Sequence, residues 1–233
     1  MPNRVISIAG AKGSPGCSFL AVALARFFAE SGVPTLLVDG DAEGGGLAAL
    51  LDLGPTAPVA ATGVSTTEAA VQIAPRLWFS ELGNAIDDRQ LNGLELAGAA
   101  RARHQAVVLD LGHRAGPVQR QLSAASDWLL WVVVPDRSGL ERADRALGSG
   151  VLGAARTGLV FNRMKRGSLD RADEVLSDRH HLPVMARIKQ DRRIADQLSL
   201  GRPVHREWRL RRTLRELARC VHPAVVTGAR SWS

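Results

Sequence analysis

The chain has 233 residues, 45% of them apolar, with 23 glycines and 11 prolines, a composition typical of one well-packed globular domain. Two cysteines are too few for a disulfide framework or a cysteine-ligated metal cluster. No apolar run approaches the roughly 18 residues that span a bilayer, and no signal peptide is visible, so we expect a cytoplasmic protein. The formal net charge of +7 allows contact with nucleic acid, anionic lipid or acidic protein and decides between none of them.

The N-terminal stretch predicts a strand, a glycine-rich turn and a helix. Residues 5–8 form a β-branched run, and residues 19–30 carry the apolar stripe of a helix. The turn between them contains Gly10, Gly13, Pro15 and Gly16. Such a turn holds phosphate, because its backbone N–H groups point inward and the helix N-terminus adds partial positive charge. The general phosphate-loop pattern G-x-x-x-x-G-K-[ST] is met only in part, since Ala11 replaces its first glycine and Cys17 its lysine.

Lys12 indicates a particular variant of this loop. The window from Lys12 to Ser18 resembles the deviant Walker A motif of the MinD/ParA family, which runs Lys-Gly-Gly-x-Gly-Lys-Thr, but it lacks the second lysine. Lys12 also stands out because the 30 basic residues include only two other lysines. The resemblance implies that Lys12 reaches the nucleotide bound by the other subunit of a dimer, and it gives a set of nucleotide-binding residues. These are Lys12, Gly13, Ser14, Pro15, Gly16, Cys17 and Ser18. The alternative is a glycine-rich turn of a Rossmann-like domain with an unrelated lysine.

Two acidic residues follow the next predicted strand, residues 35–39. Asp39 and Asp41 flank Gly40 at the carboxyl end of this strand, where open α/β sheets bind ligands. The segment resembles the Asp-x-Asp-x-x-x-Gly switch segment of the family. That resemblance implies that Asp39 helps to hold a metal site or to polarise water, and that Asp41 orients the attacking water. The alternative is a polar turn that caps a helix beginning near Leu47.

A third acid ends the apolar run 105–110. This run resembles a Walker B strand, whose acid binds Mg²⁺, often through water. Ser18, Asp39 and Asp110 are therefore the expected metal-site residues. The continuation through Gly112 and His113 departs from the Thr or Pro-Pro turn usual in the family, and a solvated loop histidine is a simpler interpretation of His113 than a phosphate contact.

The remaining pattern alternates between strands and helices. Strands are predicted at 76–82, 127–135, 158–163 and 182–188, helices at 87–103 and 140–147, and a short helix near 67–71 within a surface excursion over 54–75. Asn162 resembles the family position that reads adenine, with a capping asparagine as the alternative. Residues 191–204 resemble the closing segment of the family. Five motifs in family order over residues 4–204 imply a doubly wound, mainly parallel α/β sheet with helices on both faces.

The C-terminal residues predict a basic amphipathic helix. We divide the chain into a nucleotide-binding domain, residues 1–204, and a helix and tail, residues 205–233, docked on the same domain. Four apolar residues at helical spacing are surrounded by arginines: Leu210, Leu214, Leu217 and Val221, with Arg206, Arg209, Arg211, Arg212, Arg215 and Arg219. Relatives bind DNA or membrane through C-terminal elements, but so narrow a stripe is ordinary for a docked helix, and we expect only weak contact with DNA or lipid.

Loss of the second lysine with retention of Lys12 resembles the TadZ/CpaE branch of the family. This implies a homodimer that binds ATP or ADP with Mg²⁺ and localises pilus or secretion machinery, together with a protein partner at a cell pole or near the membrane. Losing a charged phosphate contact costs about 1.5–3 kcal/mol of binding. Charged groups that act on the transition state, such as arginine fingers, contribute on the order of 10³–10⁵ in rate, so we expect nucleotide binding to survive better than hydrolysis, with slow ATP hydrolysis at most. Cys17 cannot replace the ammonium, and the helix N-terminus is expected to lower the pKa of its thiol, so that a thiolate would repel phosphate.

Three other functions stay open on the sequence alone. One is a ParA-like partition ATPase that binds DNA non-specifically, which the loss of the lysine disfavours because cycling on DNA requires turnover. Another is a nucleotide-free pseudo-ATPase scaffold. The last is a small-molecule ligase on the same fold, which is disfavoured because no further catalytic constellation is visible.

Overall fold

A mainly parallel sheet forms the centre of the computed structural model, which describes residues 3–11, 13, 16–41, 46–53, 70–82, 92–165, 172–194 and 207–223. Within these residues eight strands form one sheet in the order β3-β4-β2-β5-β1-β6-β7-β8. The strands are β1 (Arg4–Gly10), β2 (Thr35–Asp39), β3 (Val71–Ala74), β4 (Leu77–Glu81), β5 (Ala106–Asp110), β6 (Trp128–Val133), β7 (Thr157–Met164) and β8 (Val184–Lys189). β3 pairs with β4 in the antiparallel sense, and the other neighbouring pairs in this part of the chain are parallel.

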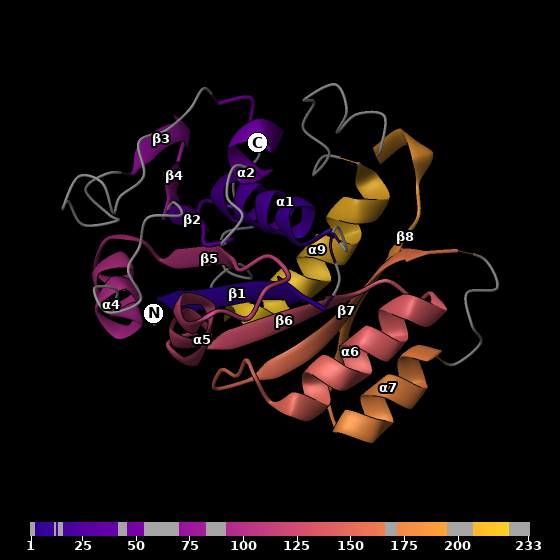
Figure 1. Cartoon of the computed structure of the whole chain (residues 1–233). Coiled ribbons are helices and arrows are strands. Elements are labelled where there is room, and N and C mark those ends of the chain that lie inside the picture. Colours follow the sequence, from indigo (N-terminus) through magenta and orange to yellow (C-terminus); the bar gives the residue numbers. More distant parts are fainter. Residues whose placement is uncertain are drawn as a thin grey trace.

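Helices cover both faces of the sheet (Figure 1). They are α1 (Cys17–Glu30), α2 (Gly46–Leu50), α4 (Gly93–Arg103), α5 (Pro117–Ala124), α6 (Arg137–Ser149), α7 (Ala172–His180) and α9 (Trp208–Val221). Alternate strand residues point to opposite faces. Ile6 and Ile8 pack with α1, α2 and α9, whereas Val5 and Ala9 pack in a second cluster with α4, α5, α6 and α7. The predicted doubly wound arrangement is therefore confirmed.

Some predicted elements differ from the structure. Val71, the last residue of the short helix expected near 67–71, begins edge strand β3 instead, and residues 67–69 lie outside the described part of the chain. α4 begins at Gly93 because Asn92 caps it, its side chain accepting hydrogen bonds from the N–H groups of Leu94 at 3.1 Å and Glu95 at 3.3 Å. Helices α5 and α7 were not predicted. Residues 195–206, with most of the expected closing segment, also fall outside the described ranges.

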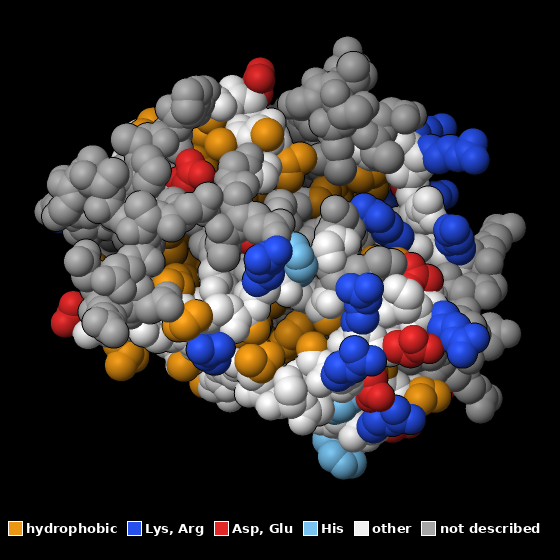
Figure 2. Space-filling view, in the orientation of Figure 1, with side chains coloured by type: hydrophobic (Ala, Val, Ile, Leu, Met, Phe, Trp, Pro, Cys, Tyr) orange, Lys and Arg blue, Asp and Glu red, His pale blue; other side chains and the backbone are white. Residues whose placement is uncertain are grey.

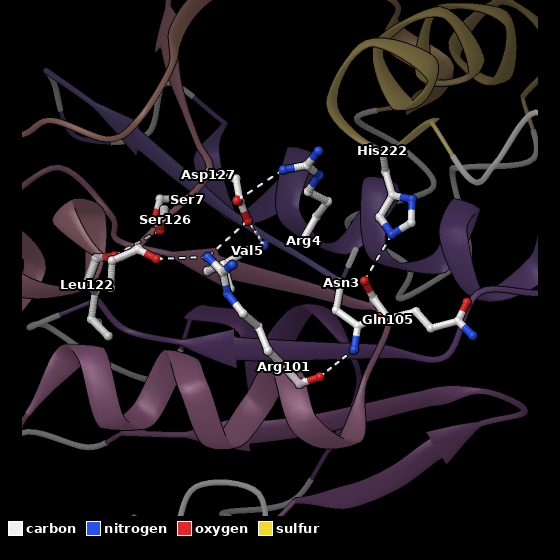
Figure 3. Close-up of polar contacts among 11 residues, drawn as sticks. Asn3, Arg4, Val5, Ser7, Arg101, Gln105, Leu122, Ser126, Asp127 and His222 are labelled. Atoms are coloured by element: carbon white, nitrogen blue, oxygen red, sulfur yellow. Dashed lines mark hydrogen bonds and ion pairs between the residues drawn. The ribbon is translucent and has the colours of Figure 1, made fainter. Parts of the chain in front are cut away.

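Polar contacts tie the strands together at the amino edge of the sheet (Figure 3). Asp127, just before β6, forms ion pairs with Arg4 of β1 at 3.2 Å and with Arg101 of α4 at 3.0 Å. His222, directly after α9, donates from Nε2 to the backbone oxygen of Gln105 at 2.9 Å. These contacts join both helical layers to the sheet at the edge opposite the carboxyl ends of the parallel strands.

Helix α9 lies against α1 and β8 with its apolar stripe inward. The residues of this stripe are at most 2% exposed and belong to the same core cluster as α1: Leu210, Leu214, Leu217 and Val221. Arg211 adds an ion pair to Glu30 at 2.7 Å and lies 5.4 Å from the ring centre of Phe27. The division of the chain at residue 204 stays a prediction. In the part of the chain described, no helix has the length and apolar character needed to cross a bilayer.

Candidate functional site

Two acidic residues lie side by side at the carboxyl edge of the sheet. Asp39 is the last residue of β2 and Asp110 the last residue of β5, and the parallel register places them directly opposite each other. Both are almost fully buried, with 2% and 1% exposure. The N–H of Gly40 donates to the backbone oxygen of Asp110 at 2.8 Å, which joins the two strand ends. The sequence prediction that these acids converge is therefore met.

The starts of two helices contact these carboxylates. Ser18, in the first turn of α1, forms a side-chain hydrogen bond with Asp110, and the N–H of Gly112 donates to Asp110 Oδ1 at 3.1 Å. Asp39 accepts from the N–H of Asp41 at Oδ1, at 3.1 Å, and from the N–H of Leu47 in α2 at Oδ2, at 3.3 Å. The expected metal-site residues Ser18, Asp39 and Asp110 thus form one connected group.

Burial controls the electrostatics of this group. It raises the pKa of Asp39 and of Asp110 to about 6, and the hydrogen bonds just described oppose the shift. The neighbouring carboxylate of Asp41 raises both pKa values further. Two adjacent buried acids with raised pKa values form an environment that a cation would stabilise.

The donor set fits Mg²⁺. Two carboxylates and a hydroxyl supply the hard oxygen ligands that Mg²⁺ prefers, and this ion usually takes its remaining ligands from water and from substrate phosphates. Within the described residues, no group of three or more His, Cys, Asp or Glu side chains is arranged to hold a metal by itself. The site therefore suits an ion that arrives with a phosphate rather than one enclosed by protein ligands.

Gly112 makes room for Asp41. Its φ of 64° lies in the left-handed region, and a Cβ at this position would clash with the Asp41 carboxylate. The backbone oxygen of Gly112 accepts from the N–H of Gly10 at 2.9 Å, which fixes the turn after β5 against the end of β1. Gly112, a departure from the usual family pattern, thus brings the predicted catalytic Asp41 close to Asp110.

The phosphate-loop residues lie next to the acids. Gly16, with φ 99°, is the N-cap of α1 and has no room for a Cβ, because the side-chain amide of Asn162 packs against it. Asn162 is buried at the carboxyl end of β7, and its Oδ1 accepts from the N–H of Arg163 at 2.8 Å. Gly13 has open space around its Cα. The structure therefore brings Asn162 to the loop, whereas Lys12, Ser14 and Pro15 lie outside the described residues.

The expectation that the helix N-terminus lowers the pKa of the Cys17 thiol is wrong. Cys17 is the first residue of α1 and only 4% exposed. Burial raises the pKa of its thiol well above the ordinary value, and the charges of Asp110 and Asp41 raise it further. Desolvation and two nearby carboxylates outweigh the helix N-terminus, so the thiol stays neutral and no thiolate repels phosphate.

A hollow of about 760 Å³ lies beside the phosphate loop, between Ala11 and one face of α6. Its other lining residues include Ser138, Glu141, Arg142, Arg145 and Ser149. Arg142 and Arg145 are exposed and form no ion pair with any described residue. Over α6, basic side chains lie among acidic ones in this view (Figure 2). No sequence motif singled out these two arginines.

Residues 6–204 match the family described as the CobQ/CobB/MinD/ParA nucleotide binding domain. The chain belongs to this family. No curated protein sequence matches the chain. Solved MinD/ParA structures share its fold at low identity. MinD of Pyrococcus horikoshii OT3, complexed with Mg-ADP, has a TM-score of 0.78 and 19% identity, covering 98% of this chain and 100% of its own.

Two further solved structures give the same result for this MinD/ParA-family chain. A ParA family ATPase from Chlorobium tepidum TLS has a TM-score of 0.77 and 20% identity, with 91% of this chain and 97% of the other covered. The MinC:MinD cell division complex of Aquifex aeolicus gives a TM-score of 0.78 and 20% identity, with 99% and 98% covered. At such identities the likeness establishes the fold, which is that of the MinD/ParA P-loop NTPases.

One polar residue beside the acids of this MinD/ParA-family chain was not predicted from the sequence. Gln119 of α5 is only 3% exposed, and its Nε2 donates to the backbone oxygen of Gly40 at 2.7 Å. Gly40 lies between the two acids of the β2 segment. A glutamine in a polar stretch carries no signal for such a contact, because its acceptor lies 79 residues away in the sequence.

Proposed function

We propose that the chain binds ATP or ADP together with Mg²⁺ at the carboxyl edge of β2 and β5. The observation that carries this proposal is the hydrogen bond from the start of α1 to the end of β5, Ser18 to Asp110, with Asp39 directly opposite. A helix N-terminus next to paired buried carboxylates offers one surface for phosphate and another for the cation that neutralises it.

Each residue of the group has a proposed part. Ser18, Asp39 and Asp110 would hold Mg²⁺, which when bound neutralises charge on the phosphates. Backbone N–H groups of residues 13–18 would hold the phosphates. Asp41, packed on Gly112, would orient a water molecule, and Asn162 would read the adenine edge. Lys12 would reach the nucleotide of a second copy of the chain.

Cys17 stands where the loop pattern has a lysine, and this favours a protein that binds nucleotide as a switch rather than one that hydrolyses it rapidly. The neutral, buried thiol provides no ammonium for the phosphates. We therefore propose a dimerising localisation factor of the TadZ/CpaE type, with slow ATP hydrolysis at most. It would act in the cytoplasm or at the membrane periphery, recruiting a protein partner of a pilus or secretion complex at a cell pole. Mg-ADP in the Pyrococcus MinD and MinC in the Aquifex complex belong to those proteins and are consistent with this proposal.

Calorimetric titration with ATP in Mg²⁺ and in EDTA tests the nucleotide site. We expect binding that is tighter in Mg²⁺, and little phosphate release over hours in a separate hydrolysis assay. An Asp110→Asn variant should lose the Mg²⁺-dependent gain in affinity while keeping the fold. Wild-type protein that shows no heat and no thermal shift with millimolar Mg-ATP would instead be a nucleotide-free pseudo-ATPase scaffold.

A second candidate is a ParA-like DNA-binding partition ATPase. Arg215 and Arg219 favour it, because both are exposed on the outer face of α9 and form no ion pair with the described residues. Non-specific DNA binding rests on such unpaired cations. The missing lysine speaks against the turnover that partition requires, so this function ranks second.

A further inference from the structure

Gln119 links helix α5 to the segment that carries Asp39 and Asp41. Its side-chain nitrogen donates to the Gly40 carbonyl at 2.7 Å, and this amide is almost fully buried. In the chain, α5 follows the turn after β5. The hydrogen bond from Gln119 therefore connects the segment that begins at Asp110 to the end of the neighbouring strand β2. A buried hydrogen bond of this kind is costly to break without a replacement, because the freed carbonyl has no access to water.

Both backbone polar groups of Gly40 are held from the β5 side. Its N–H donates to the Asp110 carbonyl at 2.8 Å, and its C=O accepts from Gln119. A Cβ on Gly40 would lie 3.1 Å from the Asp110 oxygen and 3.4 Å from Leu122 of α5, so the fit is close. Gly40, which lies between the two acids, is therefore held at its N–H by β5 and at its C=O by α5.

The positions of both acids depend on this peptide. The N–H of Asp41 donates to Asp39 Oδ1 at 3.1 Å, and the Asp41 carboxylate packs on Gly112. The Gly40 carbonyl and the Asp41 N–H belong to one planar peptide unit, so a rotation of this carbonyl away from Gln119 would also move the Asp41 N–H and shift Asp41 relative to both strands. Loss of a residue that orients a metal ligand through a hydrogen bond typically costs about 10- to 100-fold in metal affinity.

We infer that Gln119 is a positioning residue that fixes the Asp39–Gly40–Asp41 segment for the cation-dependent part of nucleotide binding. The part of this inference that concerns cation and nucleotide binding rests on the proposed function. The part that concerns the position of residues 39–41 rests on the contacts alone. Gln119 touches neither the carboxylates nor the phosphate loop in any described contact, so it acts only through Gly40.

The chain offers a matched control on the same helix. Gln121 is half-buried, and its Oε1 accepts from the N–H of Gly93 in α4 at 3.1 Å. Gln119→Leu and Gln121→Leu each remove one side-chain to backbone hydrogen bond from α5. Only the first of these bonds reaches the acidic segment. A role limited to holding α5 in place would make the two variants behave alike.

The first measurement uses nucleotide-free protein. We expect hydrogen–deuterium exchange at the amides of Gly40 and Asp41 to accelerate by about tenfold in Gln119→Leu, the effect of losing one buried hydrogen bond. Gln121→Leu should leave these two amides unchanged. Equal exchange at Gly40 and Asp41 in both variants would overturn the positioning role.

The second measurement compares the affinity for fluorescent mant-ADP in Mg²⁺ and in EDTA. We expect Gln119→Leu to reduce the Mg²⁺-dependent gain in affinity by about tenfold, while its affinity in EDTA and that of Gln121→Leu stay near wild type. An equal loss with and without Mg²⁺ would overturn the role in cation binding. Wild-type protein that binds no mant-ADP in either buffer would refute the proposed function and this part of the inference, while the exchange result still decides whether Gln119 fixes the loop.

Discussion

Asp110 shows that the proposed cation site lowers the stability of the folded protein. This carboxylate is buried, accepts from Ser18 and Gly112, and faces Asp39 in the register of the sheet. Hydrogen bonds lower its pKa, but desolvation is the larger effect, so the charged form is destabilised in the folded protein. A site kept ready for a cation therefore costs stability when the cation is absent.

An Asp110→Asn variant should be more stable than wild type above pH 6 in EDTA. The folded-state pKa of about 6 exceeds the ordinary value of 3.8, so wild type loses stability as the pH rises from about 4 to about 6. Asparagine does not ionise, so the difference in unfolding free energy should grow over that window to about 1–3 kcal/mol. Urea unfolding at pH 4, 5, 6 and 7.5 measures it. A difference that stays constant over this range would contradict the argument.

Cys17→Lys should tighten nucleotide binding. The substitution returns an ammonium to the first residue of α1, close enough to Asp110 and Asp41 for their charges to affect this position. A charged contact with phosphate is worth about 1.5–3 kcal/mol, or roughly 10- to 100-fold in affinity. Cys17→Met has similar bulk without charge and serves as the control. Equal affinities of the two variants for ATP in calorimetry would show that the missing charge does not limit binding.

Helix α9 completes the cover of one face of the sheet. It packs its buried leucines against α1 and β8, while arginines and one exposed tryptophan, Trp208, face outward. Arg209 lies 5.1 Å from the ring centre of Trp208, and Arg212 pairs with Glu216 at 3.2 Å. The helix therefore combines a structural inner face with a basic outer one.

Neighbouring substitutions on α9 separate the two faces. Leu214 is fully buried, so Leu214→Ala should cost about 2–5 kcal/mol of unfolding free energy. Arg215 is exposed, and Arg215→Ala should change stability by no more than about 0.5 kcal/mol. Urea denaturation followed by tryptophan fluorescence compares them. A smaller loss for Leu214→Ala than for Arg215→Ala would mean that α9 does not hold the fold together.

Across the whole molecule, hydrophobic periodicity and the order of the strand ends made most of the fold predictable from the sequence. Buried β-branched runs identified the strands, and the meeting of parallel strand ends predicted that Asp39 and Asp110 converge. Helix α5 was missed because it spans only eight residues and carries few apolar side chains, and β3 because it is a four-residue edge strand with an irregular register. The contact from Gln119 and the raised pKa of Cys17 depend on tertiary burial, which no local pattern carries.

Assembly should depend on Lys12. If this lysine reaches the nucleotide of a second copy, Lys12→Ala should weaken ATP-dependent dimerisation while the melting temperature of the nucleotide-free protein stays near wild type. Analytical ultracentrifugation with and without Mg-ATP measures the dimer. Lys165→Ala is the control, because it also removes one lysine, at an exposed position after β7. A dimer of unchanged affinity in Lys12→Ala would remove the family argument for this residue.

Contact with DNA should be weak and sensitive to salt. Each phosphate neutralised adds about 0.9 to the slope of log affinity against log salt for duplex DNA. On α9, Arg211 pairs with Glu30 and Arg212 with Glu216, and the exposed cations without an ion pair among the described residues are Arg209, Arg215 and Arg219. A slope of roughly 2 to 4 is therefore the most that we expect, even with further contacts from a second copy.

Filter binding over a salt series measures the slope, and two double variants assign the surface. Arg215→Glu with Arg219→Glu should weaken the residual binding strongly if α9 carries it, because only Arg209 then remains as an exposed cation without an ion pair on this helix among the described residues. Arg142→Glu with Arg145→Glu changes as many charges on the face of α6 beside the hollow and should leave that binding nearly intact. Nanomolar affinity with a steeper slope would place the DNA-partition function ahead of the localisation factor, because a chain held that tightly on DNA would spend its time on the nucleoid whatever Cys17 does to hydrolysis.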